Sequence, residues 1–293
     1  MVSNIKHRGK TKIGNKVFKW GLRTYVMGVL NVTPDSFSGD GTGNDPDFAV
    51  NQALRFEDCG ADIIDIGGES TRPSSIYAGA GPVSVDEELN RVIPVVEKLA
   101  QVLSVPISID THKSEVAREA ILAGASMIND IWGLKADSEM AVVASNANVP
   151  VVLMHNQVGT SYCDLIQEVT KVLSKLIEDA TSAGIGFENL IVDPGIGFGK
   201  TPEQNLEILR RLDEFDCLGR PILIGMSRKS TIGYVLGLPV EERVEGTAAS
   251  VAISIALGGD IVRVHDVKEM VRVARMADAI VRGWAQTTDR GIL

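Results

Sequence analysis

Cysteine is scarce in this sequence, and the three cysteines, Cys59, Cys163 and Cys217, form no Cys-x-x-Cys pair. This pattern predicts neither a disulfide framework nor a zinc knuckle. A basic excess is also lacking, because the net charge is −9. Nucleic-acid-binding proteins usually carry the opposite sign, so we expect no nucleic-acid partner.

Long hydrophobic runs are lacking too. No segment approaches the roughly eighteen apolar residues of a membrane-spanning helix, and residues 1–20 contain no apolar core of a secretory signal. We therefore expect a cytoplasmic protein without a membrane partner. The polar, Lys-rich residues 1–20 are interpreted as a flexible or weakly ordered lead-in, or as a hairpin that covers the floor of the barrel predicted below.

The chain does contain short apolar runs that are continuous rather than alternating. Continuous runs of β-branched and aliphatic residues are typical of parallel strands buried on both faces. The eight runs are Tyr25–Leu30, Ile63–Ile66, Pro106–Ile109, Ser126–Ile128, Val149–Met154, Leu190–Val192, Pro221–Ile224 and Ile261–Val264.

Amphipathic segments between the runs predict helices. They are Phe48–Cys59, Val85–Leu103, Ser114–Leu122, Ser138–Asn146, Asp164–Ala183, Pro202–Phe215, Val244–Leu257 and Val267–Trp284. Eight strand–helix units in series predict a single-domain α/β fold, a TIM (β/α)8 barrel over residues 21–293. The alternative, an open doubly wound sheet, usually has a Gly-rich first turn, whereas this one begins Asn31-Val-Thr-Pro.

Polar residues follow every predicted strand, at the end where barrel enzymes hold their active sites. Asn, Asp, Arg and His alternate there with Gly, which indicates a shaped pocket. The segments are Asn31, 67–73, 110–112, 129–130, 155–156, 193–199, 225–230 and 263–266.

Three of these residues, Asp110, Asn129 and Asp193, follow different strands and are expected to converge in the barrel mouth. Two carboxylates and an amide suit a flat heterocycle with N–H donors and a carbonyl. The alternative for each residue is a local role in capping a helix or starting a turn.

Arg263 and His265 alternate on the last strand and so face the same side. A guanidinium and an imidazole together suit phosphate or diphosphate. Asn31, which lies across the closed barrel, offers an oxygen to Mg²⁺, an ion that often takes only one or two protein ligands. The alternative for His265 is a structural role, in which its hydrogen bonds are satisfied at the start of a helix.

The loop after the seventh run is cationic and includes Lys229. It suits a phosphate, while a Schiff-base lysine and a solvated charge run are the alternatives. Two Gly- and Ser-rich loops, 33–43 and 70–81, have the length of lids. Within them, Asp35, Phe37 and Arg72 suit closure over a charged aromatic substrate.

Seven motifs along the barrel resemble the dihydropteroate synthase family. They are Met27–Ser38, Asp65–Pro73, Ser108–Thr111, Ile128–Asp130, Asp193–Lys200, Ser227–Ser230 and Arg263–His265. The resemblance implies the condensation of 7,8-dihydropterin-6-ylmethyl diphosphate with para-aminobenzoate to 7,8-dihydropteroate and diphosphate. It further implies a role in folate biosynthesis, a target for sulfonamides and a homodimer.

By the family pattern, Asp110, Asn129, Asp193 and Lys229 hold the pterin, and Asn31, Arg263 and His265 bind Mg²⁺ and diphosphate. Residues that border the para-aminobenzoate site would be Phe37, Thr71, Arg72, Pro73, Phe198 and Ser230. Diphosphate departure is expected to run ahead of amine attack, close to an SN1 path, with Asp35 stabilising the cation. Asp35, Lys229, Arg263 and His265 are the expected catalytic residues.

Three other readings remain at this point. A methyltetrahydrofolate–corrinoid methyltransferase would share the pterin-reading acids but should lack the Arg263/His265 pair and both lid loops. A non-catalytic pterin-binding paralogue should have lost Asn31, Asp35 or Arg263, all of which are present. An unrelated phosphosugar aldolase is the third.

Overall fold

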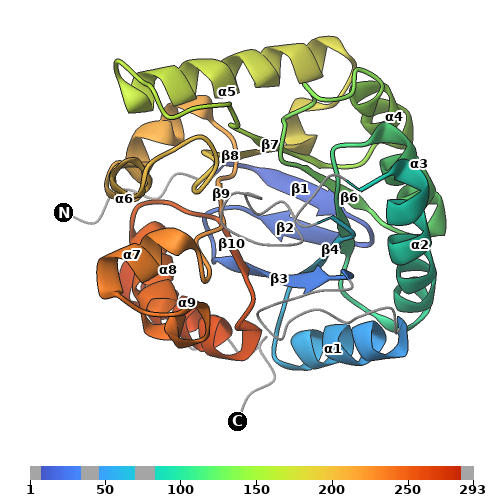
Figure 1. The fold of residues 1–293 in the computed structure, drawn as a ribbon, viewed down its shortest axis with the longest axis horizontal. Helices are drawn as coiled ribbons and strands as arrows, with labels where there is room; N and C mark the ends of the chain where they lie inside the picture. The colour runs from blue at the N-terminus through green and yellow to red at the C-terminus, as the bar shows by residue number, and fades with distance from the viewer. Residues whose placement is uncertain (1–7, 34–45, 70–82, 285–293) are drawn as a thin grey trace.

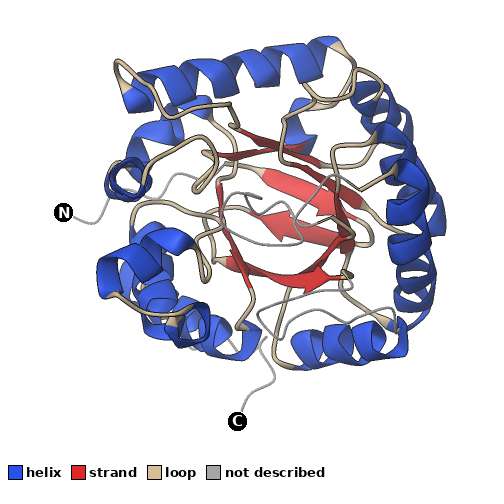
Figure 2. Ribbon diagram, viewed as in Figure 1, coloured by secondary structure: helices blue, strands red, loops and turns tan. Residues whose placement is uncertain are grey.

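A ring of parallel strands forms the centre of the molecule, and helices surround it (Figures 1 and 2). The computed structural model describes residues 8–33, 46–69 and 83–284. The ring strands are β3 (Tyr25–Asn31), β4 (Ile63–Gly67), β5 (Ile107–Asp110), β6 (Met127–Asp130), β7 (Val151–Met154), β8 (Leu190–Asp193), β9 (Leu223–Ile224) and β10 (Ile261–Val264).

The strand order is β8-β7-β6-β5-β4-β3-β10-β9, and all neighbours pair in parallel. A parallel bridge between Val192 and Ile222 brings β8 beside β9. The predicted TIM barrel is therefore confirmed, with the ring of strands nearly closed.

The helices lie close to their predicted ranges, with two differences. Their bounds are α1 (Pro46–Asp58), α2 (Val85–Val102), α3 (Ser114–Ala123), α4 (Met140–Ala147), α5 (Leu165–Ser182), α6 (Pro202–Arg210), α7 (Ser230–Leu236), α8 (Val244–Ala256) and α9 (Val267–Arg282). The predicted helix Pro202–Phe215 is wrong beyond Arg210, because the chain tightens into a 3-10 helix at Leu212–Leu218. The short helix α7 was not predicted. Among the described helices, none combines the length and apolarity that a membrane span requires.

The lead-in contains an ordered hairpin. Strands β1 (Lys10–Ile13) and β2 (Lys16–Lys19) pair antiparallel, and Trp20 is only 1% exposed. Ile13, Phe18 and Trp20 pack into one apolar cluster with inward-facing strand residues such as Met127 and Ile261. The expectation of a hairpin on the barrel floor is confirmed, and a flexible lead-in is wrong for residues 8–20, because burial of these apolar side chains fixes the hairpin.

Side chains alternate along each strand between the barrel interior and the helices. On β10, Val262 and Val264 pack in the outer core, while Ile261 packs in the floor cluster. Arg263 therefore faces the interior, one layer above Ile261. The barrel interior thus has an apolar floor, and polar residues occupy the layer above it.

Candidate active site

Five strands contribute a polar side chain to the upper layer of the interior. The residues are Asp65, Asp110, Asn129, Asp193 and Arg263, from β4, β5, β6, β8 and β10. The four acidic and amide residues are each at most 8% exposed. Asp110 and Asn129 are partners across β5 and β6, whereas Asp65 pairs with Ser108 and Asp193 with Met154; because the strands are parallel, all these groups lie toward the same end of the barrel.

Arg263 lies at the centre of this group. Its Nε donates to Asp65 Oδ2 at 2.6 Å, and its Nη2 donates to Asp110 Oδ2 at 2.7 Å. Asn129 Nδ2 donates to the same Asp65 oxygen at 3.0 Å. Two of the predicted pterin residues, Asp110 and Asn129, are therefore linked to the predicted diphosphate residue Arg263, directly or through Asp65.

Two carboxylate oxygens of this network have no hydrogen-bond partner among the described residues. They are Asp65 Oδ1 and Asp110 Oδ1, both buried. Buried carboxylate oxygens normally have donors, and leaving one without a partner is costly. These two atoms are suited to accept N–H groups of a ligand.

Burial perturbs the ionisation of this site. It raises the pKa of Asp110 to about 7, against the opposing effect of Arg263. Burial also raises the pKa of Asp193, while Lys229 favours its charged form. Asp193 Oδ1 accepts the Gly195 N–H at 2.7 Å, which fixes the carboxylate.

Lys229 lies between the mouth and the loop that follows β8. Its Nζ donates to the carbonyl of Ile196 and lies 4.7 Å from the centroid of the Phe198 ring. Burial lowers the pKa of Lys229 to about 8, although Asp193 favours the ammonium. The preceding Arg228 has a φ of +56° and donates from Nε to Asp266 Oδ2 at 3.0 Å. Ser230 is exposed and begins α7.

Asn31 and His265 lie at the ends of neighbouring strands. Asn31 pairs with Gly67 across β3 and β4, and a side chain on Gly67 would lie 3.9 Å from Asn31 Oδ1 and 3.6 Å from Asp110 Cβ. The absence of a side chain at Gly67 leaves room between them. The His265 ring contacts Ser227 Oγ through Nδ1 at 3.1 Å.

The other predicted site residues cannot be placed. Asp35, Phe37, Thr71, Arg72 and Pro73 lie outside the described residues.

Three buried residues were missed as site residues. Asp65 is 0% exposed, and its signal was a carboxylate inside the apolar run 63–66. Lys200 and His155 contact each other, with Nζ and Nδ1 2.9 Å apart. Burial and the Lys200 charge lower the pKa of His155 to about 3. Sequence gave no sign that these two residues meet, because they follow different strands.

Mg²⁺ binding can be examined from the donor atoms. The described residues contain no cluster of three or more His, Cys, Asp or Glu that would enclose a metal ion. The oxygen of Asn31 is a hard donor at the mouth, which fits an ion that keeps most of its ligands as water and phosphate. Asn31 therefore fits Mg²⁺ held largely by substrate.

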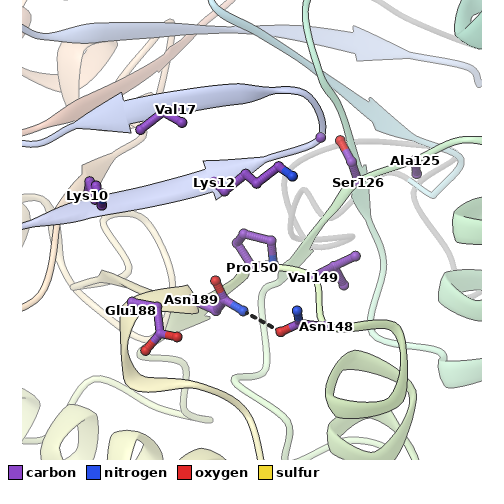
Figure 3. Close-up of a pocket in the computed structure, with 11 residues that line it drawn as sticks. Lys10, Lys12, Val17, Ala125, Ser126, Asn148, Val149, Pro150, Glu188 and Asn189 are labelled. Atoms are coloured by element: carbon purple, nitrogen blue, oxygen red, sulfur yellow. Dashed lines mark hydrogen bonds between the residues drawn. The ribbon is translucent and has the colours of Figure 1, made fainter.

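A separate cavity lies at the opposite, floor end of the barrel (Figure 3). Its volume is about 560 Å³, and the hairpin residues Lys10 and Lys12 line it together with Ser126, Asn148 and Asn189. None of the predicted site residues lines this cavity, so the mouth remains the candidate active site.

Comparisons with known proteins identify the family of this chain. Residues 27–265 match the family described as pterin binding enzyme. The chain is 53% identical over 272 residues to a dihydropteroate synthase of Clostridium beijerinckii, covering 92% of this chain and 99% of that protein.

Solved structures are similar as well. A Clostridium difficile dihydropteroate synthase crystallised in the presence of pteroic acid has 53% identity and a TM-score of 0.85, covering 90% of this chain and 98% of that one. A Xanthomonas albilineans dihydropteroate synthase with 4-aminobenzoic acid has 41% identity and a TM-score of 0.86, covering 94% and 98%.

Proposed function

The chain belongs to the pterin-binding enzyme family and is a dihydropteroate synthase of folate biosynthesis, and we propose how its residues divide the work of that reaction. The single observation that carries the proposal is the Arg263 network, because it links a predicted diphosphate residue to Asp110 and, through Asp65, to Asn129, two predicted pterin residues.

The pterin is assigned to Asp110, Asn129, Asp193 and Lys229. Asp110 Oδ1 is a buried acceptor without a partner among the described residues, and a pterin supplies N–H donors. Asn129 offers an amide group for hydrogen bonds to the pterin ring, and Lys229 offers a cation. A site that provides matched partners for buried polar groups discriminates strongly against ligands that lack them.

The diphosphate is assigned to Arg263 and His265, with Asn31 as the protein ligand of Mg²⁺. When bound, Mg²⁺ would neutralise charge that develops on the leaving diphosphate. Arg263 and His265 would hold the phosphate oxygens by charge-assisted hydrogen bonds. The catalytic set remains Asp35, Lys229, Arg263 and His265, of which Asp35 lies outside the described residues.

The para-aminobenzoate site is assigned to the side of the mouth bordered by Phe198 and Ser230. Phe198 is half-buried, Ser230 is exposed, and Lys229 connects them to the pterin residues. Phe37, Thr71, Arg72 and Pro73 complete this assignment. The arylamine is neutral at pH 7, so attack on a carbon whose diphosphate is already departing needs no strong base, which favours an SN1-like order.

A homodimer is also part of the proposal. Helices α7, α8 and α9 pack side by side and carry large exposed apolar side chains, namely Tyr234, Val235, Leu236, Ile253, Met276 and Ile280. Exposed apolar groups of this size are typical of interaction surfaces. Light scattering after gel filtration should give twice the monomer mass; a monomer at micromolar concentration would contradict it. A cytoplasmic location stays a prediction.

The assignment is tested by diphosphate release with dihydropterin diphosphate, with and without para-aminobenzoate and with and without Mg²⁺. We expect dihydropteroate only with both substrates, and much slower turnover after chelation. Arg263→Ala should weaken binding of the diphosphate-bearing pterin about tenfold or more beyond its effect on free pterin. Equal losses for the two ligands would refute the diphosphate role of Arg263.

A further inference from the structure

Lys200 ends the loop that follows β8, and it is only 8% exposed. Its Nζ donates to the carbonyls of Gly195 and Phe198 at 3.0 and 3.1 Å, and it lies 2.9 Å from His155 Nδ1. A lysine ammonium has three N–H donors. All three polar contacts of Nζ are therefore made within the protein.

The same loop is held from its other side by Lys229. Lys229 donates to the carbonyl of Ile196, whereas Lys200 takes the carbonyls on either side of it. Neighbouring carbonyls therefore point to different lysines. This geometry uses a φ of +73° at Gly195, where a side chain would come within 1.8 Å of the His155 carbonyl.

Phe198 depends on this arrangement. Its carbonyl is bound by Lys200, its N–H donates to Gly195 at 3.1 Å, and its ring faces Lys229. Asp193 itself belongs to β8, where it pairs with Met154, and its carboxylate accepts the Gly195 N–H. Loss of Lys200 would release the part of the loop that carries Phe198 more than the part that carries Asp193.

We propose that Lys200 is a positioning residue for the arylamine substrate, acting through Phe198. The inference rests on the proposed function, in which Phe198 borders the para-aminobenzoate site. His155 supports the role because its low pKa keeps the imidazole neutral, so that Nδ1 can accept the third N–H of Lys200.

The test is Lys200→Met, which keeps the apolar stem and removes the donors. We expect the KM for para-aminobenzoate to rise about tenfold, with the KM for dihydropterin diphosphate within about twofold of the parent. Lys135→Met is the control, because the exposed Lys135 donates to the Asn156 carbonyl at 2.9 Å and not to this loop. Its two KM values should stay within about twofold.

A double-mutant cycle then asks whether Lys200 acts through Phe198. In a Phe198→Leu background, Lys200→Met should add less than about threefold to the para-aminobenzoate KM. Lys200→Gln, which retains N–H donors, should show a smaller rise than Lys200→Met.

The outcomes separate the two proposals. Additive effects in the cycle, equal rises of both KM values, or no change in either would overturn the role of Lys200. So would failure of both the Met and the Gln variants to fold, since Lys200 would then serve stability alone. A parent enzyme that makes no dihydropteroate would instead refute the proposed function.

Discussion

Asp65 is fully buried beside Arg263, and Asp65→Asn replaces its charge with a neutral amide of the same shape. Removing one partner of a buried ion pair costs about 3–5 kcal/mol. Arg263 retains Asp110 at 2.7 Å, and its side chain is 21% exposed. We therefore expect the low end of that range, about 3 kcal/mol of unfolding free energy.

For a chain of this size, such a loss lowers Tm by about 6 °C. Differential scanning fluorimetry measures the shift, and urea unfolding checks it at constant temperature. Ser108→Ala is the control, because the buried Ser108 hydroxyl has no partner among the described residues and its removal breaks no described hydrogen bond. A Tm unchanged within about 1 °C in Asp65→Asn would refute the argument that this pair stabilises the barrel mouth.

Three further perturbations follow from the same region. The pKa of His155 is about 3 in the folded protein and about 6.5 in the unfolded chain, so the free energy of unfolding falls as the pH falls between these values. His155→Gln should reduce the slope of unfolding free energy against pH by about 1.4 kcal/mol per pH unit. An unchanged slope in urea titrations at several pH values would contradict this. Asp110, with a pKa of about 7, becomes a charged acceptor for the pterin N–H groups as the pH rises. The affinity for free pterin, measured by calorimetry, should therefore increase as the pH rises through 7. An affinity that does not change with pH would contradict the assignment of Asp110 to the pterin. Gly195→Ala would place Cβ 1.8 Å from the His155 carbonyl, so a Tm loss of several degrees is expected, and wild-type melting would show that the loop can shift.

The sequence was sufficient to predict the barrel because parallel strands buried on both faces leave continuous apolar runs. All eight predicted runs overlap observed strands. Residues directly after the runs, such as Asp110, Asn129 and Asp193, could be predicted to converge because parallel strands end on the same side. Their meeting in one buried layer follows from topology rather than from contacts between neighbouring residues.

Other features depend on tertiary contacts that no local pattern reports. The helix α7 has only seven residues and a central Gly233, so it lacks a full amphipathic repeat. Asp65 was counted as part of a strand because its apolar neighbours dominate the run 63–66. The Lys200–His155 contact joins the end of the loop after β8 to the residue after β7, 45 positions apart in sequence.

The charges of the mouth bear on how a diphosphate can be received there. Asp65, Asp110 and Asp193 place three carboxylates in the layer where Arg263 and Lys229 are the nearest cations. Arg263 already has two carboxylate partners, so a diphosphate must compete with them for its guanidinium.

A divalent cation beside Asn31 would offset that competition, since Mg²⁺ binds phosphate oxygens directly and needs few protein ligands. We therefore expect the enzyme to bind its anionic substrate as a magnesium complex, while free pterin needs no metal.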